Sequence, residues 1–127
     1  MTYPEQGDLD RLLDDLTARL SCVRHAVVVT AEGLPRSRSA DLTYEQAEYF
    51  CALAAVLHNL ARTAGSHFGV GNARQSMIEL DHGYLVIAAI GTDACLAVLT
   101  EEGAAMGFVA FEMNRTVRRL ARMLSPA

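Results

Sequence analysis

The spacing of apolar residues predicts three helices. Leucines recur every three or four positions over residues 9–20, which places them on one stripe of a helix. A longer helix is expected over residues 44–67, because Thr43 and Gln46 form a capping-box pattern at its start and glycines follow its end. The same periodicity returns over residues 106–124. The chain therefore has three amphipathic helices, and the second is the longest.

Five other segments have the composition of β-strands. They are residues 25–30, 34–39, 74–80, 84–90 and 94–100. The connections between the last three strands are so short that only hairpins can form, so these strands are antiparallel. Pro35 cannot donate a ladder hydrogen bond, which indicates that the second strand lies at an edge of the sheet.

Three of these strands contain continuous apolar runs, at residues 27–29, 85–90 and 96–99. A strand with one face in water would alternate apolar and polar residues, so helices must cover these strands on both faces. The predicted fold is α/β: a three-layer α/β/α sandwich with a five-stranded antiparallel sheet. Its order is helix-strand-strand-helix-strand-strand-strand-helix. We expect a single domain over residues 8–125 and a disordered N-terminal tail over residues 1–7.

The long helix has a wider apolar surface than one contact with a sheet requires. Two adjoining apolar stripes cover much of its circumference, and Ala52 and Ala55 lie in the middle of the remaining face. Small residues there would let a second helix approach closely. The third strand could be a sheet edge that pairs with a second copy. The predicted homodimer interface comprises Ala47, Phe50, Ala52, Ala55, Leu57 and Met77. The alternative is a helix buried in its own domain, with alanines present for their helix propensity.

Composition and charge exclude several functions. The 127 residues carry a net charge of −4 and no lysine, so neither nucleic acid nor an anionic membrane is an expected partner. The three cysteines, Cys22, Cys51 and Cys95, form no C-x-x-C pair and are expected to be reduced thiols. The N-terminus resembles no signal peptide, and no apolar run reaches the roughly 20 residues of a membrane span. We expect a soluble, cytoplasmic protein.

Candidate catalytic chemistry is sparse. The glycines of residues 65–71 follow a helix and precede a strand, whereas a phosphate-binding loop follows a strand and opens a helix. The four histidines lack metal-ligand spacing, and no serine lies in a nucleophile elbow. We therefore predict no enzymatic activity, no catalytic residue, no metal and no cofactor.

The ordered set of segments resembles a known family. The stretches at residues 23–34 (VRHAVVVTAEGL) and 75–86 (QSMIELDHGYLV), together with Gly91 and residues 96–99 (LAVL), resemble the roadblock/dynein light-chain domain family. The likeness is greatest to its bacterial branch, encoded beside small Ras-like GTPases, and the lysine-free composition fits an actinobacterial member. This resemblance implies a homodimer in which the long helices and third strands of two copies meet.

The resemblance also implies a function. Relatives of the MglB type bind a GTPase of the MglA type on the paired long helices and accelerate GTP hydrolysis without donating catalytic residues. We therefore expect a homodimeric signalling regulator or scaffold that binds a small Ras-like GTPase, either as a GTPase-activating protein or as an adaptor. The expected contacts are Glu45, Glu48, Asn59 and Arg62, on the polar rim of the long helix.

Two features leave the exact partner open. Ser21 and Cys22 stand where the family usually has proline and glycine, and the second strand is unusually polar. An alternative from another class is a small-molecule sensor domain of the PAS-like or profilin-like type. Such a domain needs a pocket with convergent polar groups, and the apolar run at residues 85–90 is poorly suited to line one. An unrecognised hydrolase is the third alternative, and it lacks a nucleophile–base pair.

Overall fold

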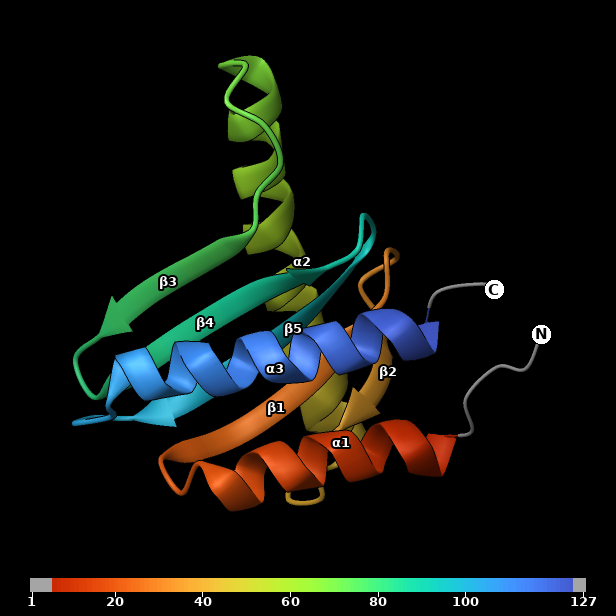
Figure 1. Cartoon of the computed structure of the whole chain (residues 1–127), viewed down its shortest axis with the longest axis vertical. Helices are drawn as coiled ribbons and strands as arrows, with labels where there is room; N and C mark the ends of the chain where they lie inside the picture. The colour runs from red at the N-terminus through yellow and green to blue at the C-terminus, as the bar shows by residue number, and fades with distance from the viewer. Residues whose placement is uncertain (1–5, 125–127) are drawn as a thin grey trace.

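The computed structural model describes residues 6–124 and contains a five-stranded antiparallel sheet with helices on both faces (Figure 1). The elements are α1 (Gln6–Arg19), β1 (Val23–Val29), β2 (Pro35–Arg38), α2 (Tyr44–His67), β3 (Gln75–Leu80), β4 (Gly83–Ile90), β5 (Ala94–Glu101) and α3 (Met106–Leu124). The strand order across the sheet is β2-β1-β5-β4-β3. The predicted fold class and element order are confirmed, and β2 and β3 are the two edge strands.

The start of the first helix differs from the prediction. Gln6 and Gly7 were expected in a disordered tail, but they form the first turn of α1. The Gln6 amide donates hydrogen bonds to a carboxylate oxygen of Asp10 and to the backbone carbonyl of Arg36 in β2, which fixes this turn against the sheet. Residues 1–5 of the predicted tail, and residue 125 of the predicted domain, lie outside the described residues.

Each face of the sheet has its own core. On one face, α1 and α3 pack against β1, β4 and β5 through a cluster rich in leucine and valine, which includes Leu13, Val28, Val98 and Leu120. On the other face, α2 packs through smaller residues. The buried members of this second cluster are Val27, Val29, Leu42, Ala47, Cys51, Ala54, Ile87, Cys95 and Ala97. Because α2 contacts the sheet through alanine and cysteine, its axis can lie close to the strands.

Helix α2 starts at a complete capping box. The Thr43 hydroxyl accepts a hydrogen bond from the Gln46 backbone nitrogen at 3.1 Å. The side-chain oxygen of Gln46 in turn accepts one from the Thr43 backbone nitrogen at 3.0 Å. The C-terminal end of α2 projects beyond the sheet, and residues 68–74 run back along it to β3 (Figure 1). A Cβ on Gly65 would lie 2.1 Å from the Gly71 carbonyl oxygen, so glycine permits this close return.

Candidate interaction surface on helix α2

One face of α2 is buried against the sheet. Its line runs through Ala47, Cys51, Ala54, His58 and Gly65, which follow one another at helical spacing. Ala47, Cys51 and Ala54 are completely buried within the chain itself. The prediction that Ala47 contributes to a dimer interface is therefore wrong, because this residue has no surface to offer a partner.

The opposite face of α2 is apolar and exposed. Tyr49, Leu53, Val56 and Leu60 are 70%, 45%, 59% and 62% exposed, and their spacing of four, three and four residues places them on a single stripe. We call these four residues the outer stripe. Contiguous apolar side chains of this size are uncommon on the surface of a monomer and mark contact sites. The outer stripe is therefore the strongest candidate for an interface on this helix.

The edge strand β3 forms an open margin of the sheet. β3 pairs with β4, and no other described strand pairs with its free edge. Met77 pairs with Val86, so its side chain points to the face covered by α1 and α3, whereas Ile78 pairs with Leu85 on the α2 face. Met77 and Leu80 remain about half exposed. An unpaired strand edge of this kind is a template for adding another strand.

The other predicted interface residues lie in three different environments. Phe50 and Leu57 are half-buried at the margin of the α2 core, so part of each side chain is still accessible. Ala55 is also half-buried, and its Cβ would lie 3.3 Å from a Cβ on Gly33 in the β1–β2 turn. Ala52 is exposed. These positions remain predictions, and the larger exposed surface belongs to the outer stripe.

The predicted partner-binding residues are all exposed on α2, but they form two groups. Glu45 and Glu48 lie in its first turns, and Asn59 and Arg62 lie near its C-terminal end. At 1.5 Å rise per residue, Glu45 and Arg62 are separated by about 25 Å along the axis. The structure thus places Asn59 and Arg62 close together, whereas Glu45 and Glu48 lie at the other end of the helix.

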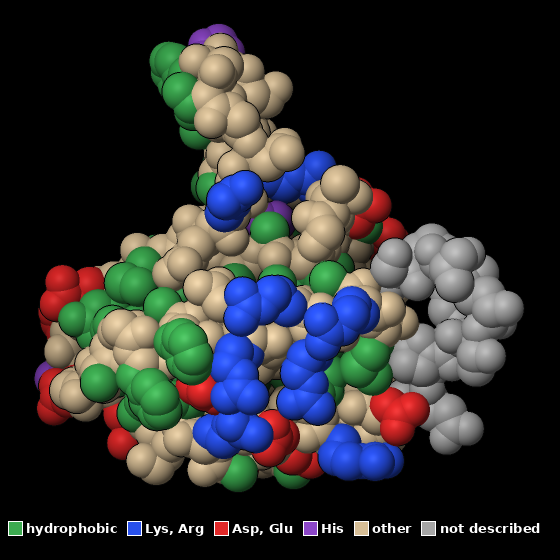
Figure 2. Space-filling model, viewed as in Figure 1, with side chains coloured by type: hydrophobic (Ala, Val, Ile, Leu, Met, Phe, Trp, Pro, Cys, Tyr) green, Lys and Arg blue, Asp and Glu red, His purple; other side chains and the backbone are tan. Residues whose placement is uncertain are grey.

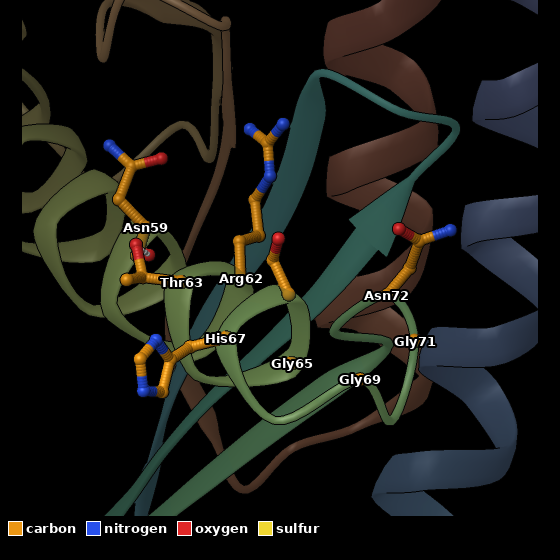
Figure 3. A pocket seen from close by; sticks show the side chains of 9 residues that line it. Asn59, Arg62, Thr63, Gly65, His67, Gly69, Gly71 and Asn72 are labelled. Atoms are coloured by element: carbon orange, nitrogen blue, oxygen red, sulfur yellow. Dashed lines mark hydrogen bonds between the residues drawn. The ribbon is translucent and has the colours of Figure 1, made fainter.

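Asn59 and Arg62 line an open polar pocket of about 900 Å³ (Figure 3). Figure 3 shows Asn59, Thr63 and His67 extending from α2, with Asn72 on the returning segment opposite. The lining residues are Asn59, Arg62, Thr63, Gly65, Ser66, His67, Gly69, Gly71 and Asn72. Sequence reasoning had treated residues 65–71 only as a loop. The missed signal is the glycine spacing, which allows the loop to return beside the helix.

Burial shifts the pKa values of three titratable groups on and beneath α2. Burial, and secondarily the nearby Arg62 guanidinium, lowers the pKa of His58. Burial raises the pKa of the Cys51 thiol to about 12, with a further contribution from Cys95, and raises the pKa of Cys95 to about 11. Both thiols are thus protonated and poor nucleophiles at neutral pH. These groups contribute to the core rather than to a reactive site.

Two kinds of feature are absent from the described residues. Residues 6–124 contain no group of three or more histidine, cysteine, aspartate or glutamate side chains arranged to hold a metal ion. None of the helices in the same range is both long and apolar enough to cross a membrane.

Comparison with known proteins identifies the family. The sequence pattern of the Roadblock/LC7 domain family matches residues 9–100, so the chain belongs to this family. A Roadblock/LC7 domain from Streptomyces avermitilis has 34% sequence identity and a TM-score of 0.86, over 91% of this chain and 96% of that one. An uncharacterised protein of Methanocaldococcus jannaschii is 28% identical over 91% of this chain and 95% of its own length.

The fold is shared with a protein of lower sequence identity. MglB of Myxococcus xanthus has a TM-score of 0.86 with 15% identity, over 97% of this chain and 92% of that one. At this identity the likeness concerns the fold alone. The suspected resemblance to the roadblock family, including the MglB-type architecture, is confirmed at the level of family and fold.

Proposed function

We propose that this chain is a non-enzymatic, homodimeric regulator or scaffold that binds a small Ras-like GTPase. The observation that carries the proposal is the outer stripe on α2, together with the open edge of β3. Both features expose groups that favour burial or pairing. A second copy is the natural occupant, because an isologous contact pairs each surface with itself.

The proposed dimer joins the two β3 edges antiparallel, which extends the sheet, and packs the outer stripes of two α2 helices against each other. Leu53 and Leu60 would lie near its centre, with the accessible parts of Phe50 and Leu57 at its margin. Ala52 and Met77 remain proposed contributors, on α2 and β3 respectively. This interface would also support the end of α2 that projects beyond the sheet.

A GTPase partner is supported by two considerations. The bacterial branch that the sequence resembles regulates GTPases of the MglA type, and the MglB architecture superposes on nearly all of this chain. The polar flank with Asn59 and Arg62 would remain accessible after the outer stripes pair. We place the GTPase contacts at Glu45, Glu48, Asn59 and Arg62. The regulator would act by positioning the GTPase's own groups or by recruiting it.

The dimer is tested by light scattering of wild type and variants. Wild type should have twice the 13.8 kDa mass of one chain. Leu53→Glu/Leu60→Glu should reduce the mass to that of one chain, because four buried carboxylates per dimer would lack partners. Leu34→Glu is the matched control, since Leu34 is equally exposed but lies in the β1–β2 turn. A wild-type mass of 13.8 kDa would contradict the dimer.

The GTPase proposal is tested with a small Ras-like GTPase of the MglA type, loaded with GTP. Co-elution with faster hydrolysis would establish an activating regulator, and co-elution alone would establish a scaffold. Asn59→Ala/Arg62→Ala should raise the Kd of the complex at least about tenfold, which is the effect of losing one or two well-placed contacts. Arg24→Ala, an exposed arginine on β1, is the control.

The pocket at the end of α2 is the one observation that favours the alternative, a small-molecule sensor. Its volume of about 900 Å³ is large enough for a small ligand, but the pocket is open to solvent and polar, unlike the enclosed apolar pockets that bury small ligands. Failure of the GTPase to co-elute in either nucleotide state would overturn the main proposal, and the pocket would then be the site to screen for ligands.

A further inference from the structure

Helix α3 has an exposed ridge on the face opposite α2. Phe108, Phe111, Arg115, Arg118 and Arg122 are spaced by three, four, three and four residues, so they form one line along the helix. Phe108 and Phe111 are 54% and 57% exposed. Figure 2 shows arginines gathered over the middle of the face that α1 and α3 cover, with apolar side chains beside them. We call these five residues the α3 ridge.

The charge of α3 contrasts with the rest of the chain. The helix carries four of the eleven basic residues but one of the fifteen acidic ones, whereas the whole chain has a net charge of −4. Arginines near a helix C-terminus are favoured by the helix dipole, which partly explains Arg118 and Arg122. The dipole does not explain two phenylalanines on the same line at the other end.

The neighbouring carboxylates are already paired. Glu112 is buried between the guanidinium groups of Arg115, at 3.1 Å, and Arg19, at 3.8 Å. On α1, Asp15 lies 3.1 Å from Arg19 and 3.6 Å from Arg119. These contacts hold α1 against α3 and pair the carboxylates of Asp15 and Glu112 with arginines.

Two arginines of the ridge are left without such a partner. Within residues 6–124, neither Arg118 nor Arg122 lies within salt-bridge distance of a carboxylate. Both are exposed. Aromatic residues and arginine are also the types that contribute most to protein interfaces.

We propose that the α3 ridge docks an acidic amphipathic helix of a partner protein. The apolar face of that helix would cover Phe108 and Phe111, and its carboxylates would pair with Arg118 and Arg122. A groove of about 470 Å³ lies between α1 and α3. It is lined by Leu12 and Met123 together with charged residues of both helices, namely Asp8, Arg11, Asp15, Arg19 and Arg119.

A peptide suits this surface better than an anionic membrane. Exposed carboxylates on α1, including those of Asp8 and Asp14, share the α1/α3 layer with the ridge, and a flat anionic bilayer would be brought close to them. A narrow helix can contact the ridge and leave these carboxylates in water. The ridge and the outer stripe of α2 lie on opposite layers, so the proposal is independent of the GTPase proposal.

The test measures fluorescence anisotropy of a labelled synthetic helix of roughly four turns, with leucines on one face and glutamates flanking them. Wild type should bind it with a Kd below about 1 mM, and more tightly at low salt. Phe108→Ala/Phe111→Ala and Arg118→Glu/Arg122→Glu should each weaken binding at least about tenfold. Arg24→Glu, which alters an exposed arginine on β1, should leave binding unchanged. Replacing the probe's glutamates by lysine should also weaken binding at least about tenfold.

Several outcomes would overturn the proposal. They are an absence of binding at about 1 mM probe, equal binding of the glutamate and lysine probes, and equal binding by wild type and Arg118→Glu/Arg122→Glu. Binding of wild type to phosphatidylcholine–phosphatidylserine vesicles in preference to the probe, lost in the ridge variants, would assign the surface to a membrane instead. The arginine pair is exposed and lies outside the buried core, so this variant decides the matter if the phenylalanine variant unfolds. Circular dichroism of the variant checks that α3 is retained.

Discussion

Gly65 shows how one missing Cβ shapes the projecting end of α2. Alanine normally stabilises a helix interior relative to glycine by about 1 kcal/mol. At Gly65, however, the added Cβ would lie 2.1 Å from the backbone oxygen of Gly71, which cannot move without displacing the returning segment. The cost of this steric clash should therefore exceed the gain in helix propensity from replacing glycine by alanine.

We expect Gly65→Ala to lower the free energy of unfolding by about 1–3 kcal/mol, as overpacking typically does. Gly107→Ala in α3 is the matched control, because nothing lies within 4 Å of a Cβ there. The control should be neutral or stabilising by up to about 1 kcal/mol. Urea unfolding measures both, and equal effects would contradict the close approach of Gly65 to Gly71.

His58 should make stability depend on pH. Burial lowers its folded-state pKa below the ordinary value of 6.5, so below pH 6.5 the unfolded chain binds more protons at this site than the folded chain. The His58 contribution to stability is therefore constant above pH 6.5 and decreases as the pH falls from 6.5 toward the folded-state pKa.

We expect His58→Leu to show a smaller loss of Tm between about pH 7 and pH 5 than wild type. His67→Gln is the control, since His67 is exposed at the end of the same helix and should leave the wild-type slope unchanged. Thermal unfolding at several pH values measures the difference. A greater loss of Tm toward acid pH in His58→Leu than in wild type would contradict a lowered pKa of His58 in the folded state.

At the scale of elements, the start of α2 was predictable because its signal is local. The side chain of each of Thr43 and Gln46 hydrogen-bonds the backbone nitrogen of the other within one turn, so this pair of residues is enough to locate the start of the helix.

Thr43→Ala should lower the free energy of unfolding by about 1 kcal/mol, because the first turn of α2 loses its cap. Thr63→Ala is the control, because the Thr63 hydroxyl only bonds back to the Asn59 carbonyl within the helix. Equal losses in urea unfolding would argue against the cap.

The rotation of α2 about its axis was not predictable to the same precision. Its apolar arc is so wide that either of two stripes could face the sheet. In the structure, the line through Ala47, Cys51, Ala54 and His58 faces the sheet. This orientation removes Ala47 from the surface and exposes the outer stripe.

At the scale of the whole molecule, the proposed dimer couples stability to concentration. Burial of the outer stripe occurs only in the associated, folded state, so mass action should raise the Tm as the protein concentration rises. Leu53→Glu/Leu60→Glu should have a Tm independent of concentration, and Leu34→Glu should behave like wild type. Differential scanning calorimetry over a hundredfold range of concentration, about 4–400 μM, provides the comparison. A wild-type Tm that does not change would argue against a dimer in this range.

The sequence by itself determined the elements, their order and the three layers. These follow from local periodicity, short connections and apolar runs, each of which is contained within a short stretch of the sequence. Only the tertiary structure decided which stripe of α2 is buried, that Gln6 ties α1 to β2, and that Arg118 and Arg122 on the α3 ridge have no carboxylate partner among residues 6–124. These features depend on the rotation and spacing of elements far apart in the chain, where packing selects among arrangements that the local pattern leaves equal.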